Sequence, residues 1–174
     1  MRPLAVLTLA VLLAACGDAA GEEAAAGPTA DCGPVEAVAV QGGSHLLGDQ
    51  EPPVPYNSTP PTSGWHSSGG FEIAVQGPDE PLGEPDHVSV LEAGGVVASY
   101  RGLAADERER LEAHVAAEPL AGRVAVTSYE AIDEGAVVFT GWGALQRCAA
   151  LDLAALDAFA ATYADPEPEV PGGH

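Results

Sequence analysis

The stretch VAVTSYEAIDEGAVVFTGW, residues 124–142, decides the fold that we expect. Two runs rich in β-branched and aromatic residues, 124–129 and 136–142, flank the acidic turn Asp133-Glu134-Gly135. Such runs about a short glycine-containing turn are typical of a β-hairpin. The sequence therefore predicts an antiparallel pair of strands here.

A helix is predicted on each side of this hairpin. Residues 106–117 place Leu111 and Val115 on one helical face. The second helix begins after Asp152, which can cap it, and ends before Pro166. Its apolar stripe consists of Leu153, Leu156, Phe159 and Tyr163.

Four further runs, 35–41, 71–75, 87–90 and 95–100, are predicted to be strands. Between the first two lies a long segment, residues 42–70, in which Gly, Pro and Ser dominate. A loop of this length inside a compact domain is often functional. The predicted fold is α+β, with a mainly antiparallel sheet, two helices on one side and this long Pro/Gly-rich loop.

The charge of the chain excludes one class of partner. Asp and Glu number 26 against 6 Lys and Arg, which gives a formal net charge of -20. No nucleic acid is expected as a partner, because so few cations cannot neutralise a row of phosphates. An anionic membrane surface also repels this chain unless a covalent anchor holds it there.

The N-terminus predicts such an anchor. Arg2 precedes an apolar run, residues 4–13, that is too short to span a bilayer and is typical of a secretory signal peptide. The run ends in L-A-A-C, which resembles a bacterial lipobox whose cysteine, here Cys16, is lipidated. The alternative is an ordinary signal peptide cut near Ala15. We expect an extracytoplasmic lipoprotein that is anchored to the membrane through Cys16.

The chain divides into four predicted parts. Residues 1–15 form the lipoprotein signal peptide, and residues 16–31 form the lipidated cysteine and a flexible acidic tether without Val, Leu, Ile or aromatic residues. Residues 32–164 form one domain. Residues 165–174 are Pro-rich and acidic, and we expect them to be a disordered tail.

Two cysteines remain in the expected domain, Cys32 and Cys148. In a secreted protein a pair near the two ends of a domain favours a disulfide. The alternatives are two separate thiols, or two metal ligands that act with histidine.

The segment YNSTPPTSGWH, residues 56–66, resembles the P-P-T-S-G-x-H signature of domain-of-unknown-function family 3105. The segment LEAGGVV at residues 91–97 and Trp142-Gly143 also match, and the resemblance covers residues 32–169. It implies a bacterial protein of a kind that is often tethered to the membrane. It implies no established activity.

One motif departs from the family pattern. The family typically has H-N-L-E-H-G at its second motif, and alignment on Leu91 and Glu92 places the two histidines at Ser89 and Ala93. His87 lies two residues before Ser89. If residues 87–90 formed a strand, His87 would lie one pleat repeat, roughly 6–7 Å, from the lost ligand, too far to replace it.

A transition-metal site is one hypothesis for the remaining histidines. His45, His66, His87 and Glu92 are its candidate ligands. Imidazole and carboxylate donors suit a copper or zinc ion. The alternative is that these histidines bond to backbone groups and hold the long loop in place.

The sequence favours a non-catalytic protein. Ser63 lies close to His66, but no nucleophile-elbow pattern surrounds it. Three aromatic residues in or beside the long loop, Tyr56, Trp65 and Phe71, could bind an envelope protein or peptide if they are exposed. We therefore expect a lipid-anchored binding or structural module of the cell envelope, with a copper- or zinc-binding lipoprotein as the alternative.

Overall fold

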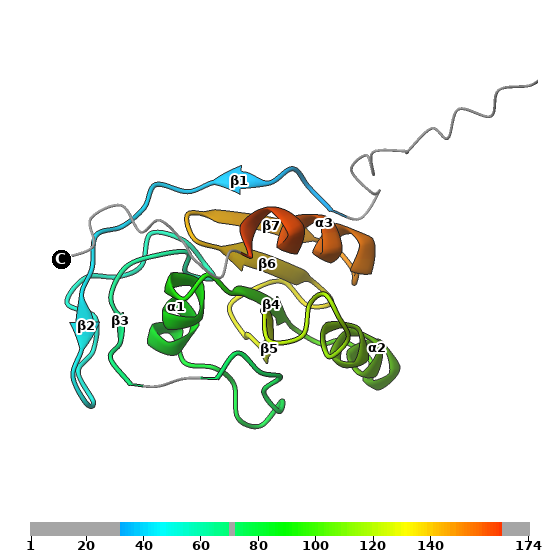
Figure 1. The fold of residues 1–174 in the computed structure, drawn as a ribbon, viewed down its shortest axis with the longest axis horizontal. Coiled ribbons are helices and arrows are strands. Elements are labelled where there is room, and N and C mark those ends of the chain that lie inside the picture. Colours follow the sequence, from blue (N-terminus) through cyan, green and yellow to red (C-terminus); the bar gives the residue numbers. More distant parts are fainter. Residues whose placement is uncertain (1–31, 70–71, 165–174) are drawn as a thin grey trace, which may run out of the picture.

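The computed structural model describes residues 32–69 and 72–164 (Figure 1). The predicted signal peptide, Cys16 with its tether, and the C-terminal tail lie outside the described residues. The main sheet has the strand order β1-β7-β6-β4-β5. Its strands are β1 (Glu36–Ala37), β4 (Val96–Tyr100), β5 (Val124–Ser128), β6 (Val137–Gly141) and β7 (Ala144–Cys148).

The predicted α+β class is confirmed. In the main sheet β1–β7, β7–β6 and β6–β4 pair antiparallel, and only β4–β5 pair parallel. A separate pair is formed by β2 (His45–Leu46) and β3 (His66–Ser67), which run parallel within the long loop. The helices are α1 (Glu84–Glu92), α2 (Ala105–Val115) and α3 (Leu153–Tyr163). None of the helices in residues 32–69 and 72–164 is long and apolar enough to cross a membrane.

The predicted hairpin over residues 124–142 is wrong, because β4 lies between β5 and β6. Helix α2 carries the chain from β4 back to the start of β5, so these two strands pair parallel. The acidic turn does form, but Gly135 donates to the carbonyl of Arg101 beyond β4 rather than closing a hairpin. The hairpin of this region is β6–β7, and it turns at Gly143, whose φ is +69°.

Helices cover both faces of the main sheet. On one face Ala98 of β4 packs in a cluster with Leu111 of α2 and Phe159 of α3. These are the two helices that were predicted on one side of the sheet. On the other face Val97 packs with Val90 and Leu91 of α1. Strand β4 is therefore buried at every position.

The predicted strand at residues 87–90 is wrong, because these residues lie in α1. Gly83 caps this helix and Pro85 lies in its first turn, where a missing N–H costs no hydrogen bond. A short apolar run does not distinguish a buried strand from a buried helix. Here all residues from His87 to Leu91 are buried between the sheet and β3.

Two further predicted strands are shorter than expected. Within residues 35–41 only β1 pairs with the sheet. Within residues 71–75 only Val75 forms a bridge, to Val126 on the outer edge of β5, and Phe71 lies outside the described residues.

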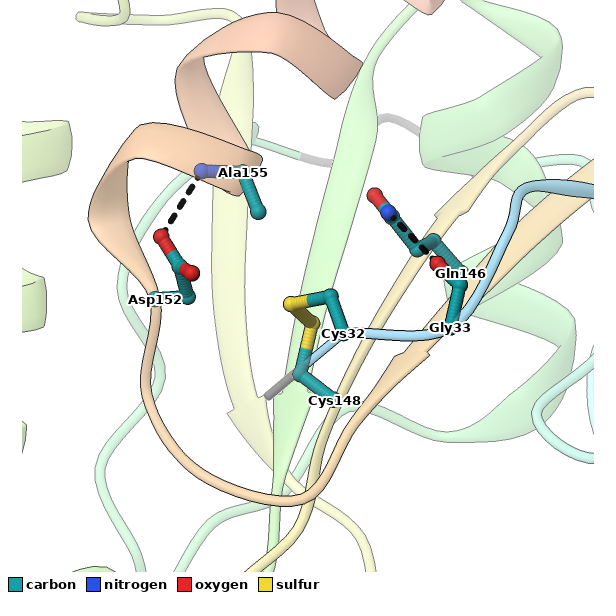
Figure 2. The surroundings of a disulfide bond; sticks show 6 residues. All are labelled: Cys32, Gly33, Gln146, Cys148, Asp152 and Ala155. Atoms are coloured by element: carbon teal, nitrogen blue, oxygen red, sulfur yellow. Dashed lines mark hydrogen bonds between the residues drawn. A yellow bond between two sulfur atoms is a disulfide. The ribbon is translucent and has the colours of Figure 1, made fainter. Parts of the chain in front are cut away.

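The predicted disulfide between Cys32 and Cys148 is present (Figure 2). It joins residues 116 positions apart and ties the start of the domain to the end of β7. Gln146 adds a side-chain hydrogen bond to the carbonyl of Gly33, and Asp152 caps α3 through the N–H of Ala155, as predicted.

Candidate metal centre

The β2–β3 pair brings two histidines together. His45 and His66 are direct partners in the parallel register, so their side chains lie on the same face of the pair. Their ring centroids are 4.7 Å apart, with the ring planes at 75°. Figure 1 shows this pair beside α1, away from the β5 edge of the main sheet.

Glycines allow the two strands to approach. A Cβ atom on Gly43 would lie 2.2 Å from the carbonyl carbon of Gly64, so any side chain at Gly43 forces the backbones apart. Gly64 has a φ of +123°, a conformation that L side chains rarely adopt. Both glycines lie within two residues of a candidate histidine.

Hydrogen bonds fix the rest of the loop around His66. The Tyr56 hydroxyl donates to the carbonyl of Trp65 at 2.6 Å. The Ser63 hydroxyl accepts from the N–H of Gln41, and the carbonyl of Thr62 accepts from Gly143 in the β6–β7 turn. Thr62 and Ser63 are fully buried, so the P-P-T-S-G-x-H segment is part of the packed domain.

Helix α1 supplies the carboxylate. Ser89 donates to the carbonyl of Ser67, which holds this helical face against β3. Three residues later, Glu92 places Oε2 at 2.8 Å from His66 Nε2 and at 4.0 Å from His45 Nε2. One ligand atom from each of the three residues lies within 4.8 Å of the others.

The tautomer of His66 follows from its partners. Its Nδ1 lies 2.9 Å from the carbonyl oxygen of Gly64, which only accepts, so Nδ1 carries a hydrogen. In the neutral ring Nε2 then holds a lone pair, which faces the carboxylate of Glu92. Nε2 is buried and lies 2.8 Å from Glu92 Oε2, the distance of an ion pair. A cation, either a proton on Nε2 or a metal ion, is needed to relieve the repulsion between the two lone pairs.

The three side chains run from the interior to the surface. The side chain of His66 is 5 % exposed, that of Glu92 26 % and that of His45 47 %. The protein therefore encloses the site on the His66 side, and His45 lies at its outer edge.

His87, the fourth predicted ligand, is not part of this cluster. It is fully buried in α1, and its Nε2 lies 2.7 Å from the Thr140 hydroxyl of β6. Burial lowers the pKa of His87 to about 3. Its ring therefore stays neutral inside the core.

Ser89 and Ala93 lie on the helical face that carries the site. Ser89 is buried and contacts β3 through its hydroxyl, and Ala93 is exposed one turn later at the end of α1. Residues four apart lie on the same side of a helix. The two positions at which the resemblance places histidines therefore flank Glu92.

Two aromatic residues of the loop, Tyr56 and Trp65, are half-buried rather than exposed to solvent. The pKa of Tyr56 is raised to about 12, first by burial and then by the carboxylates of Glu84 and Asp86. Tyr56 supports the site through its hydrogen bond to the backbone carbonyl of Trp65, the residue before His66.

A protein family of unknown function, DUF3105, matches residues 49–173. The chain belongs to this family. No curated protein and no solved structure matches the chain. Within the DUF3105 match lie His66 and Glu92, whereas His45 lies four residues before it begins.

The sequence alone did not single out the glycines of this site. Gly43 is one half of Gly42-Gly43, which in sequence looks like an ordinary loop marker. The only signal is its distance of two residues from His45. The contact with Gly64 requires the parallel pairing of β2 and β3, which no local pattern indicates.

Proposed function

We propose that this DUF3105 protein is a non-catalytic module that binds Cu(II) or Zn(II) through His45, His66 and Glu92. One observation carries the proposal: ligand atoms of His45, His66 and Glu92 converge within 4.8 Å of one another, with both Nε2 atoms facing Glu92 Oε2, at 4.0 Å and 2.8 Å. A cation between these three atoms satisfies all of them.

A metal ion fits the cluster after small shifts of the donors. Zn(II) holds nitrogen and oxygen donors at ~2.0–2.2 Å in a tetrahedron, which puts two donors of one ion roughly 3.3–3.6 Å apart. His66 Nε2 and Glu92 Oε2 lie 2.8 Å apart and separate by about 0.5–0.8 Å to hold the ion between them. His45 Nε2, at 4.0 Å from the same oxygen, moves inward by about 0.5 Å.

A second imidazole favours a metal ion over a lone proton. The ring of His45 packs edge-on at 4.7 Å from that of His66, and its Nε2 lies 4.0 Å from the same carboxylate oxygen, so a second imidazole nitrogen faces Glu92. Two nitrogens and one oxygen form a donor set for Cu(II) and Zn(II), with Cu(II) bound more tightly. Among the described residues the cluster contains no cysteine, whose thiolate is a donor that selects Cu(I).

The proposed setting is the outer side of a membrane. The lipobox-like L-A-A-C sequence supports lipidation at Cys16, and the Cys32–Cys148 disulfide supports an oxidising compartment. Intact-mass measurement of the membrane-extracted protein is expected to show a mature chain that begins at Cys16 with added acyl mass. An unmodified N-terminus would contradict the anchor and would leave the metal site unaffected.

Metal titration of the purified domain tests the proposal. We expect one equivalent of Cu(II) or Zn(II) to bind at micromolar concentration, as followed by calorimetry. The variants His66→Ala and Glu92→Gln are expected to weaken binding by ~100-fold, because loss of even an outer-shell partner costs ~10–100-fold. His114→Ala is the matched control, since His114 pairs with Asp157 on other helices. Equal binding by all four proteins would overturn the proposal.

A further inference from the structure

We infer that the metal bound at His45, His66 and Glu92 keeps an open coordination position on its solvent side, and that this position takes an imidazole-type nitrogen donor from a second molecule. The inference rests on the proposed metal site and goes beyond it. It concerns what the site binds in addition to the ion.

The number of donors leaves a position unfilled. In the described parts of the chain, the cluster offers three ligand atoms and no fourth His, Cys, Asp or Glu. The hydroxyl of Ser89, on the same helical face as Glu92, donates to the carbonyls of Ser67 and Pro85. Closed structural sites hold four protein ligands, whereas three ligands leave a position for water or a substrate.

The exposure of the ligands shows where this position lies. His66 and its carbonyl partner Gly64 close the inner side, because the His66 side chain is only 5 % exposed. The outer side is bordered by His45, which is 47 % exposed, and by the exposed Ala93 at the end of α1. A ligand that approaches past these two residues meets no bulky side chain at position 93.

Charge selects the kind of donor. The chain carries a formal charge of -20, and Glu92 places a carboxylate in the site itself. Glu92 neutralises one of the two charges of the ion, and the acidic chain around the site lowers the local concentration of small anions, so neutral donors are favoured. Imidazole nitrogen suits both Cu(II) and Zn(II). A neutral imidazole, or the histidine side chain of a partner, is therefore the ligand class that fits.

The test uses the Cu(II)-loaded protein, whose visible and electron paramagnetic resonance spectra report the donors on the ion. Addition of imidazole is expected to change both spectra with a stoichiometry of one, while the copper stays bound through a subsequent desalting step. Azide, as the anionic probe, is expected to bind at least about tenfold more weakly.

The variant His45→Ala provides a second readout. Removal of His45 opens another position, so this variant is expected to bind two imidazoles, and the first is expected to restore the spectrum of the wild type. Spectra that do not change with excess imidazole would overturn the inference, as would removal of the copper by imidazole. Absence of Cu(II) binding before imidazole is added would instead refute the proposed metal site.

Discussion

Two buried histidines, His66 of β3 and His87 of α1, differ in their hydrogen-bond and ion-pair partners. His66 has Nδ1 on a backbone carbonyl, Nε2 facing Glu92 and a second imidazole beside it. Among the described residues, His87 has Nε2 on the Thr140 hydroxyl, a buried Nδ1 that makes no hydrogen bond, and no ion pair with a carboxylate.

The difference teaches that burial alone does not identify a ligand. Burial without a carboxylate lowers the pKa of His87 and makes it a neutral part of the core. His66 has an opposing lone pair and an opening to the surface through His45, which is what a cation requires. The predictions below test this contrast between core histidine and site histidine.

The largest expected effect is on acid stability, and it comes from His87. Its pKa is about 3 in the folded protein against 6.5 in the unfolded chain, so between these values the unfolded chain binds one more proton. Stability is therefore complete above pH 6.5 and falls as the pH drops, by about 1.4 kcal/mol per pH unit from this residue. Urea unfolding of the metal-free protein between pH 4 and 7 measures this slope.

The variant His87→Gln supplies the reference for that slope. It lacks the titrating ring, so the difference in unfolding free energy between wild type and variant is expected to shrink as the pH falls. Its affinity for Cu(II) at neutral pH is expected to stay within about twofold of the wild type, because a core residue is not a ligand. A loss of metal binding comparable to that of His66→Ala would abolish the contrast between the two histidines.

The disulfide is expected to affect the stability of the core and not the metal site. The double variant Cys32→Ser/Cys148→Ser is expected to lose about 2–4 kcal/mol of unfolding free energy, because the bond closes a long loop in the unfolded chain. Cu(II) affinity is expected to be unchanged, since the disulfide joins Cys32, before β1, to the end of β7, whereas β2, β3 and α1 carry the site. Denaturant unfolding and calorimetry measure the two quantities. A parallel drop in affinity would show that the site depends on the disulfide between Cys32 and β7.

Metal binding itself is expected to stabilise the folded chain. A ligand that binds only the folded state at 100 times its Kd adds about 2.7 kcal/mol, which raises the Tm on the order of 10 °C. Thermal unfolding with and without Cu(II) measures this shift in the wild type and in His87→Gln. The shift is expected to vanish in Glu92→Gln. A shift that persists in that variant would place the bound ion elsewhere.

The sequence predicted which residues supply donors to the site better than it predicted the strand pairing and helix packing that bring them together. Strand β5 pairs with β4 rather than with β6 because α2 returns the chain to the free edge of β4. No local sequence pattern indicates which edge the chain returns to. The residues His87–Leu91 form a helix because a two-sided core accepts an apolar run in either conformation. His45, His66 and Glu92 were identifiable as donors by residue type, but their meeting point depends on β2 and β3 pairing in register and on α1 packing against β3.

A smaller effect is expected at Gly43. An added methyl group collides with the backbone of Gly64, so Gly43→Ala is expected to separate β2 from β3 and to weaken Cu(II) binding by about tenfold, as misplaced supporting residues do at other metal sites. Gly42→Ala is the matched control, because a Cβ atom there meets nothing within 4 Å. Calorimetric titration compares the two variants. Equal affinities would mean that the loop relaxes around the methyl group and still delivers His45.

The smallest expected gain comes from a new donor at position 93. Ala93 is exposed one turn beyond Ser89, on the helical face that already contacts β3, so the variant Ala93→His places a nitrogen at the solvent side of the ion. We expect Cu(II) affinity to rise by about tenfold over Ala93→Gln, the control that adds bulk without an imidazole. Imidazole binding to the loaded variant is expected to be lost, because the open position is then filled. An unchanged response to imidazole would show that position 93 does not border the open side. Glu92 would then be the last residue of α1 that contributes to the site.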